Sequence, residues 1–190
     1  YFPGSDALQE CIARAYLGPG ETLMMVSPTY DNFRANAAVS GANIVYHSLG
    51  KGFTFDSSRF IEDVKRHCPK IAYLCSPNNP TGTMYTQNTI EQLLSEAPNT
   101  MFLIDEAYFE FSEITAAPLV TRYQNVIVSR SLSKAFGLAS FRVGYALAPD
   151  EIIRTLDLVR NPKCVPAMSQ IAALAAFNDL SHVSNYVRDV

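Results

Sequence analysis

Six short runs of mostly apolar residues constrain the fold of this chain more than any other feature. Each is bounded by turn residues, and together they cover residues 22–26, 43–46, 70–75, 101–104, 125–129 and 143–147. A strand with one face in water alternates apolar and polar residues, whereas an unbroken apolar run is typical of a strand buried on both faces. The runs therefore predict a sheet that is covered on both sides.

Segments with helical spacing of apolar residues separate these strands. They predict helices over 5–16, 57–67 and 150–159, shorter ones through 35–39 and 89–94, another over 166–177, and a helix at the chain's end. Ser5 or Asp6 is placed to cap the first helix. Strand and helix alternate without a repeat or a linker. This predicts one domain of the α/β class, with a mostly parallel sheet and helices on both faces.

The composition bears on whether the protein binds nucleic acid, a membrane or a metal. The 190 residues are 48% hydrophobic and 17% charged with a net charge of -3, which gives no support for binding nucleic acid. No apolar run approaches the ~20 residues needed to span a bilayer, and no secretory leader pattern opens the chain. Four cysteines lie far apart without metal-binding spacing, so we expect reduced, mostly buried thiols, no metal site and a cytoplasmic location.

In parallel sheets, ligands collect at the carboxyl ends of the strands. The unusual residues of this sequence stand there. Lys134 follows an apolar run, with the hydroxyls of Ser131 and Ser133 before it and Arg142 after it. Hydroxyls and a guanidinium suit a phosphate, and an amine in a partly desolvated pocket beside that cation becomes nucleophilic. The alternative is a surface loop with solvated charges.

Asp105 ends another apolar strand. A buried carboxylate is costly unless it is paired, and a protonated ring nitrogen of a cofactor would be such a partner. The alternative is that Asp105 caps a helix or meets an arginine. After a third strand, residues 76–82 form a turn made rigid by two prolines and a glycine, from which Asn79 could offer its amide to a ring oxygen.

Two further features fit a bound cofactor but are weak alone. Residues 4–6 open a helix whose free N–H groups suit a phosphate, although an ordinary helix cap is the default interpretation. Tyr30 follows a strand and could stack on an aromatic ring, although a tyrosine of the core is the more common explanation.

Together these residues resemble the fold-type I enzymes that use pyridoxal 5'-phosphate (PLP), specifically the class I/II aminotransferases and their histidinol-phosphate aminotransferase branch. The strings SPNNPTG, DEAYFEF and SRSLSKAFGLASFRVGYALA occur in the order and at the spacing of that family. The similarity extends from about Gly4 to Phe177. It implies the large, PLP-binding domain of fold type I.

The resemblance implies a role for each candidate residue. At the ring, Lys134 would hold PLP as a Schiff base and move the substrate's proton. Asp105 would pair with the ring nitrogen, Asn79 and Tyr108 would contact the ring's 3-oxygen, and Tyr30 would stack on the ring. The phosphate would be held by Ser131, Ser133, Arg142 and the backbone of Ser5, Asp6 and Ala7.

Departures from the family leave the substrate open. Ala7 stands where the branch usually has Glu, a change that backbone contacts to a phosphate should survive. The loop 160–165 lacks the branch's Pro-x-Asn-x pattern. This loop argues against histidinol phosphate itself, so the resemblance implies an amino acid substrate, with histidinol phosphate and an aromatic or related amino acid as the candidates. The family's substrate-binding arginine and partner-subunit tyrosine lie in segments that we do not find. We expect residues 1–190 to be the large domain of a longer, homodimeric enzyme.

Three functions remain open at this point. An aminotransferase would move an amino group between an amino acid and a 2-oxo acid. Another PLP enzyme on the same scaffold, such as a decarboxylase of a phosphorylated amino acid or a β-lyase, would break a different bond. A non-catalytic PLP fold would sense an effector for a DNA-binding module. Transamination is the interpretation that the motifs favour.

Overall fold

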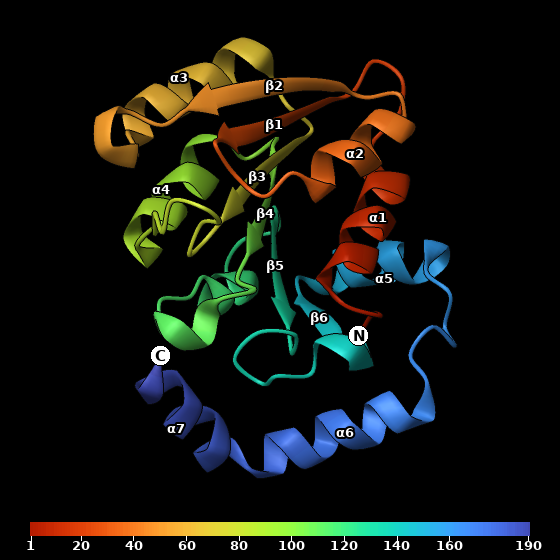
Figure 1. Ribbon diagram of the computed structural model, residues 1–190. Coiled ribbons are helices and arrows are strands. Elements are labelled where there is room, and N and C mark those ends of the chain that lie inside the picture. Colours follow the sequence, from red (N-terminus) through yellow and green to blue (C-terminus); the bar gives the residue numbers. More distant parts are fainter.

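The computed structural model describes residues 1–190 and contains a six-stranded sheet (Figure 1). The strands are β1 (Thr22–Ser27), β2 (Asn43–Ser48), β3 (Ile71–Cys75), β4 (Met101–Asp105), β5 (Val126–Ser131) and β6 (Gly144–Leu147). They lie in the order β2-β1-β3-β4-β5-β6, and only β5 and β6 pair antiparallel. The prediction of a mostly parallel sheet is confirmed, with one antiparallel strand at an edge.

Both faces of the central strands β1, β3, β4 and β5 are buried, which explains their unbroken apolar runs, whereas the edge strands β2 and β6 are only partly buried. Successive side chains of a strand point to opposite faces. Met24 and Ile104 belong to a cluster of 18 buried residues on one face, and Met25 and Leu103 to a cluster of 17 on the other. Each fully buried side chain of this size stabilises the fold by roughly 1.5–3 kcal/mol.

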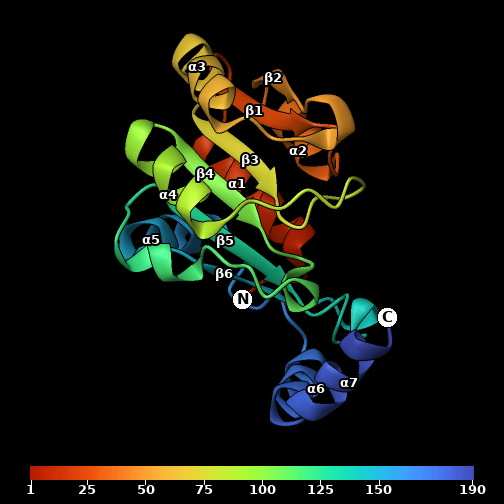
Figure 2. The same ribbon diagram turned by 90° about the vertical axis from the view of Figure 1, so that its left-hand side faces the viewer.

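Helices cover both faces, as predicted (Figures 1 and 2). On one side lie α3 (Ser57–His67) and α4 (Gln87–Glu96), and on the other lie α1 (Ser5–Tyr16), α2 (Asn32–Val39) and α5 (Asp150–Val159). The predicted helices are all present, but α2 and α4 begin earlier in the chain than their apolar residues indicated. The central strands and α1 position the polar residues discussed below.

The start of α1 corrects one prediction. Its N-cap is Gly4, with φ 88° and ψ 168°, and no side chain caps the helix. A positive φ costs glycine little, so the turn into the helix falls at residue 4, and Ser5 and Asp6 lie in the first turn. A β-carbon at residue 4 would also collide with the guanidinium of Arg142. The first N–H groups of α1 are therefore left without a side-chain acceptor.

The last two helices, α6 (Ala167–Asn178) and α7 (Leu180–Asp189), lie apart from the layered body (Figure 1). One side of α6 packs through Ala173 against Leu132 and Val143. Its other side exposes Ile171 and Leu174. The predicted helix at the end of the chain is present as α7.

None of the helices has the length and hydropathy that a membrane crossing requires. The four cysteines are all free thiols. Cys11 and Cys75 are buried, whereas Cys164 is partly buried and Cys68 is exposed. The expectation of mostly buried thiols therefore holds for only two of them.

Candidate active site

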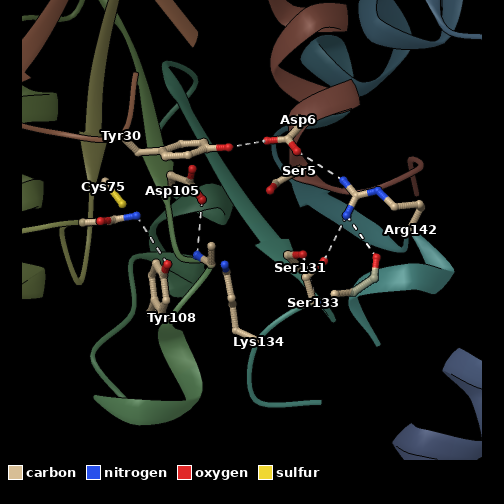
Figure 3. Close-up of a pocket in the computed structure, with 13 residues that line it drawn as sticks. Ser5, Asp6, Tyr30, Cys75, Asp105, Tyr108, Ser131, Ser133, Lys134 and Arg142 are labelled. Atoms are coloured by element: carbon tan, nitrogen blue, oxygen red, sulfur yellow. Dashed lines mark hydrogen bonds and ion pairs between the residues drawn. The ribbon is translucent and has the colours of Figure 1, made fainter. Parts of the chain in front are cut away.

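Ten of the eleven candidate residues line one pocket at the carboxyl ends of the parallel strands, and Ala7 is not among its lining residues (Figure 3). The predicted members are Ser5, Asp6, Tyr30, Asn79, Asp105, Tyr108, Ser131, Ser133, Lys134 and Arg142, and Cys75, Ala107 and Ala139 complete the lining. Parallel strands end at the same edge of a sheet, so the topology brings together residues that are more than a hundred positions apart in the sequence.

Asp105 is the buried acid of the pocket. Its side chain is 2% exposed, and each carboxylate oxygen accepts two hydrogen bonds. Oδ2 accepts from Tyr73 at 2.9 Å and Gln9 at 3.0 Å, and Oδ1 from Ser129 at 3.0 Å and the N–H of Ala107 at 3.2 Å. Burial raises the pKa of Asp105 above its ordinary value, and the hydrogen bonds from Tyr73, Ser129 and the Ala107 N–H oppose the rise. All four donors are neutral. The alternative that the Asp105 carboxylate is paired with an arginine is therefore not observed.

The loop after β3 is fixed by Asn78. Its Nδ2 donates to the carbonyl of Pro28 at 2.9 Å and to Thr81 Oγ1 at 2.7 Å, and its Oδ1 accepts from Thr29 at 2.6 Å. Asn78 thus holds the turn, and Asn79 is left to face the pocket.

Asn79 and Lys134 both lie beside Tyr108. Asn79 Nδ2 donates to Tyr108 Oη at 3.5 Å, and Lys134 Nζ lies 5.3 Å from the centre of the Tyr108 ring. Lys134 itself is exposed, which corrects the expectation of a partly desolvated amine. The reason is that its turn lies at the rim of the pocket beyond β5 (Figure 3).

Arg142 lies at the end of the pocket opposite Tyr108 (Figure 3). Its guanidinium donates to Ser133 Oγ at 3.4 Å and to the Asp6 carboxylate at 3.2 Å. Ser131 Oγ accepts instead from the N–H of Ser133, at 3.1 Å. The cation, two hydroxyls and the uncapped start of α1 form one cluster of donors. Such a cluster suits a phosphate, because helix N-termini and guanidinium groups both favour anions.

Tyr30 lies at the pocket wall rather than in the core. Its side chain is 40% exposed, and its hydroxyl donates to Asp6 Oδ1 at 3.3 Å. Partial burial and the nearby Asp6 carboxylate raise the pKa of the Tyr30 phenol. Because the Tyr30 side chain lines the pocket, one face of its ring is available to a ligand there (Figure 3).

Three residues behind Asp105 were missed from the sequence. Ser129 stands opposite Asp105 in the pairing of β4 and β5, so a strand alignment could have found it. Gln9 is a polar residue on the buried side of α1, and Tyr73 lies in a wholly buried strand. A polar side chain at a position where the pattern is otherwise apolar could have indicated both residues, because a buried polar group requires a hydrogen-bond partner.

The comparisons agree with this architecture. The family model for aminotransferase class I and II matches residues 1–189. A dihydroxyacetone phosphate transaminase of Campylobacter jejuni is 45% identical over 191 residues, which cover 100% of this chain and 52% of that protein. A histidinol-phosphate aminotransferase of Caldanaerobacter subterraneus is 38% identical, over 97% of this chain and 53% of its own length.

Solved structures of similar proteins share the fold. A putative histidinol-phosphate aminotransferase from Erwinia carotovora superposes with a TM-score of 0.92 at 29% identity, over 98% of this chain and 56% of that one. The histidinol-phosphate aminotransferase of Sinorhizobium meliloti, solved with PLP, gives 0.91 at 25% identity, over 98% and 51% of the two chains. This chain spans about half the length of the curated relatives it matches. It belongs to the family of class I and II aminotransferases, with the fold of the type I PLP enzymes.

Proposed function

We propose that this chain binds PLP and serves an aminotransferase that moves an amino group between an amino acid and a 2-oxo acid. One observation carries the proposal: an amine, a buried carboxylate and a guanidinium line the same pocket, as Lys134, Asp105 and Arg142. An aldehyde, a basic ring nitrogen and a phosphate are the groups that these three would bind. PLP carries all of them.

The donor set of the pocket fits this cofactor at both ends. At the phosphate end, the start of α1 has no side-chain cap and lies beside Arg142, Ser131 and Ser133. At the ring end, Asp105 is buried and has neutral partners, so a cationic ring nitrogen would add the missing charge. Asn79 and Tyr108 offer an amide and a phenol to a ring oxygen, and Tyr30 offers a stacking face.

Each of these residues would then have its own role in the reaction. When bound, PLP supplies a conjugated ring that withdraws electrons from the reacting carbon. Lys134 would anchor the cofactor and afterwards hold and return the proton of the substrate's α-carbon. Asp105 would keep the ring nitrogen protonated. Arg142 and Ser133 would anchor the phosphate, so that the ring stays fixed while Lys134 moves the proton.

For the substrate, we propose a small phosphate ester or an aromatic amino acid. The relatives in the comparisons are named for dihydroxyacetone phosphate and histidinol phosphate, and both of those molecules carry a phosphate. The exposed apolar side of α6 supports a homodimer, which light scattering would measure. Four free thiols support a reducing, cytoplasmic location.

Spectra of the purified protein with PLP, before and after addition of amine donors, would test the reaction. The panel would contain histidinol phosphate, aromatic amino acids and, for the reverse direction, dihydroxyacetone phosphate. Conversion to the pyridoxamine form, reversed by an oxo compound, is expected. Release of carbon dioxide without that conversion would point to a decarboxylase, and a bound cofactor that never turns over would favour a sensor.

Attachment can be tested independently of turnover. Borohydride reduction followed by peptide mapping should place the label on Lys134. A label on Lys51, Lys65, Lys70 or Lys163, or no label, would contradict the assignment.

A further inference from the structure

Gln9 is the buried polar residue of α1. Its side chain is 0% exposed, and its helix neighbours Leu8 and Ile12 are buried apolar residues. A buried amide is costly unless both of its ends have partners. Gln9 has both: its Nε2 donates to Asp105 Oδ2 at 3.0 Å, and its Oε1 accepts from Asn32 Nδ2 at 3.0 Å.

Asn32 fixes which end of the Gln9 amide faces Asp105. The NH₂ group of Asn32 can only donate, so it selects the oxygen of Gln9 and turns the nitrogen of Gln9 toward the carboxylate. The same NH₂ group donates to Asp6 Oδ1 at 3.4 Å, which holds it between two acceptors. A reversed Gln9 amide would place its oxygen against the Asp105 carboxylate and repel it.

Tyr73 is the second donor to the same carboxylate oxygen, at 2.9 Å, and it is also 0% exposed. All direct hydrogen-bond partners of Asp105 are neutral. The Lys134 amine, the Arg142 guanidinium and the phenols of Tyr30 and Tyr108 line the same pocket without a hydrogen bond to Asp105. From α1 comes the Asp6 carboxylate, which opposes ionisation of Asp105, and β3 provides the Cys75 thiol beside Tyr73. The ionised form of Asp105 therefore depends on neutral hydrogen-bond donors.

We propose that Gln9 and Asn32 are positioning residues for Asp105. Asn32 orients the Gln9 amide, and Gln9 together with Tyr73 keeps the Asp105 carboxylate ionised for a cationic ring nitrogen. The ligand part of this inference rests on the proposed binding of PLP, whereas the effect on Asp105 itself does not.

Gln9→Met tests the first step, because it keeps the length of the side chain and removes the donor. In cofactor-free protein labelled with ¹³C, the Asp105 carboxyl signal should titrate at higher pH in Gln9→Met than in wild type. Leu8→Met is the matched control: it changes a neighbouring buried side chain of α1 and should leave the titration unchanged. Asn32→Ala should shift the titration in the same direction as Gln9→Met.

PLP binding gives the second readout. The ionised carboxylate binds the ring cation, so affinity is present above the pKa of Asp105 and is lost as pH falls through it. In Gln9→Met that loss should begin at higher pH. At the pH where the wild-type Asp105 signal titrates, we expect a PLP Kd about tenfold weaker than in wild type, corresponding to one charge-assisted hydrogen bond, with little change well above that pH.

The outcomes separate the two ideas. An Asp105 titration that is the same in Gln9→Met, Leu8→Met and wild type would overturn the inference. An unchanged titration in Asn32→Ala would overturn the role of Asn32. If Gln9→Met raises the Asp105 titration but wild type takes up no PLP, the proposed function fails while the action of Gln9 on Asp105 stands.

Discussion

The Arg130 guanidinium pairs with the Glu106 carboxylate at 2.9 Å, one residue beyond the contact between Ser129 and Asp105. Ser129 and Arg130 are neighbours on β5, so their side chains point to opposite faces of the sheet. Glu106 is 1% exposed, and Arg130 also stacks on Phe109, with its Cζ 3.6 Å from the ring centre. The ends of β4 and β5 are thus joined by side chains on both faces.

Arg130→Met should destabilise the protein strongly, because it leaves the buried Glu106 carboxylate without its cation. We expect a loss of about 3–5 kcal/mol in the free energy of unfolding. Urea denaturation measures it. The matched control is Arg122→Met, which breaks the pair with Glu91 at a site where Arg122 is 56% exposed, and it should cost about 1 kcal/mol or less. Equal losses in the two variants would contradict the importance of the buried pair.

Asp105→Asn should change how stability depends on pH. Burial raises the pKa of Asp105, so the folded protein binds that proton more tightly than the unfolded chain does. Wild type therefore loses stability as pH rises from the ordinary carboxyl pKa, near about 4, through the raised value. The amide in Asp105→Asn does not titrate, so this variant does not lose stability with rising pH in this way. The difference in unfolding free energy between wild type and variant should decrease with rising pH in cofactor-free protein.

Urea denaturation at a series of pH values measures that slope. Asp189→Asn, which removes an exposed carboxylate at the end of α7, should give curves parallel to wild type. A pH-independent difference between wild type and Asp105→Asn would show that burial does not govern the ionisation of Asp105.

Lys134→Ala should abolish the borohydride label while leaving the fold intact. Lys134 is exposed, and substitution of an exposed side chain usually changes stability by no more than about 0.5 kcal/mol. Thermal unfolding checks the fold, and mass spectrometry after reduction checks the label. Lys163→Ala, at another exposed lysine, should retain the label. Full labelling of Lys134→Ala would mean that another amine anchors the cofactor.

Arg142→Met should discriminate between PLP and pyridoxal, which lacks the phosphate. Loss of a charged donor to the phosphate should weaken PLP binding about tenfold to a hundredfold, with pyridoxal nearly unaffected. Fluorescence titration with both compounds measures the ratio. Arg154→Met, on the exposed side of α5, is the control. Equal weakening for both compounds would place Arg142 away from the phosphate.

The sequence was sufficient to predict the class of the fold and ten of the 13 residues that line the pocket. Unbroken apolar strands require cover on both faces, and parallel strands carry Asn79, Asp105 and Lys134 to one edge. Both predictions depend on local patterns, which the sequence contains. The direction of β6 does not follow from such a pattern, because a short apolar run fits either orientation.

Long-range contacts account for the rest. Gln9 meets Asp105 across 96 positions, and Arg142 meets Asp6 across 136. No local spacing encodes these pairs. The exposure of Lys134 was predicted wrongly for the same reason, since it depends on how the turn after β5 sits at the rim of the pocket.

One helix serves both ends of the pocket. The backbone at Ser5 begins α1 beside Arg142, and Gln9, one turn further along, contacts Asp105. Four residues of α-helix rise about 6 Å, a length fixed by the repeating backbone hydrogen bonds. The distance between the Arg142 end and the Asp105 end of the pocket is therefore set by helical geometry. A cofactor analogue with one extra methylene between its ring and its phosphate would satisfy one end only.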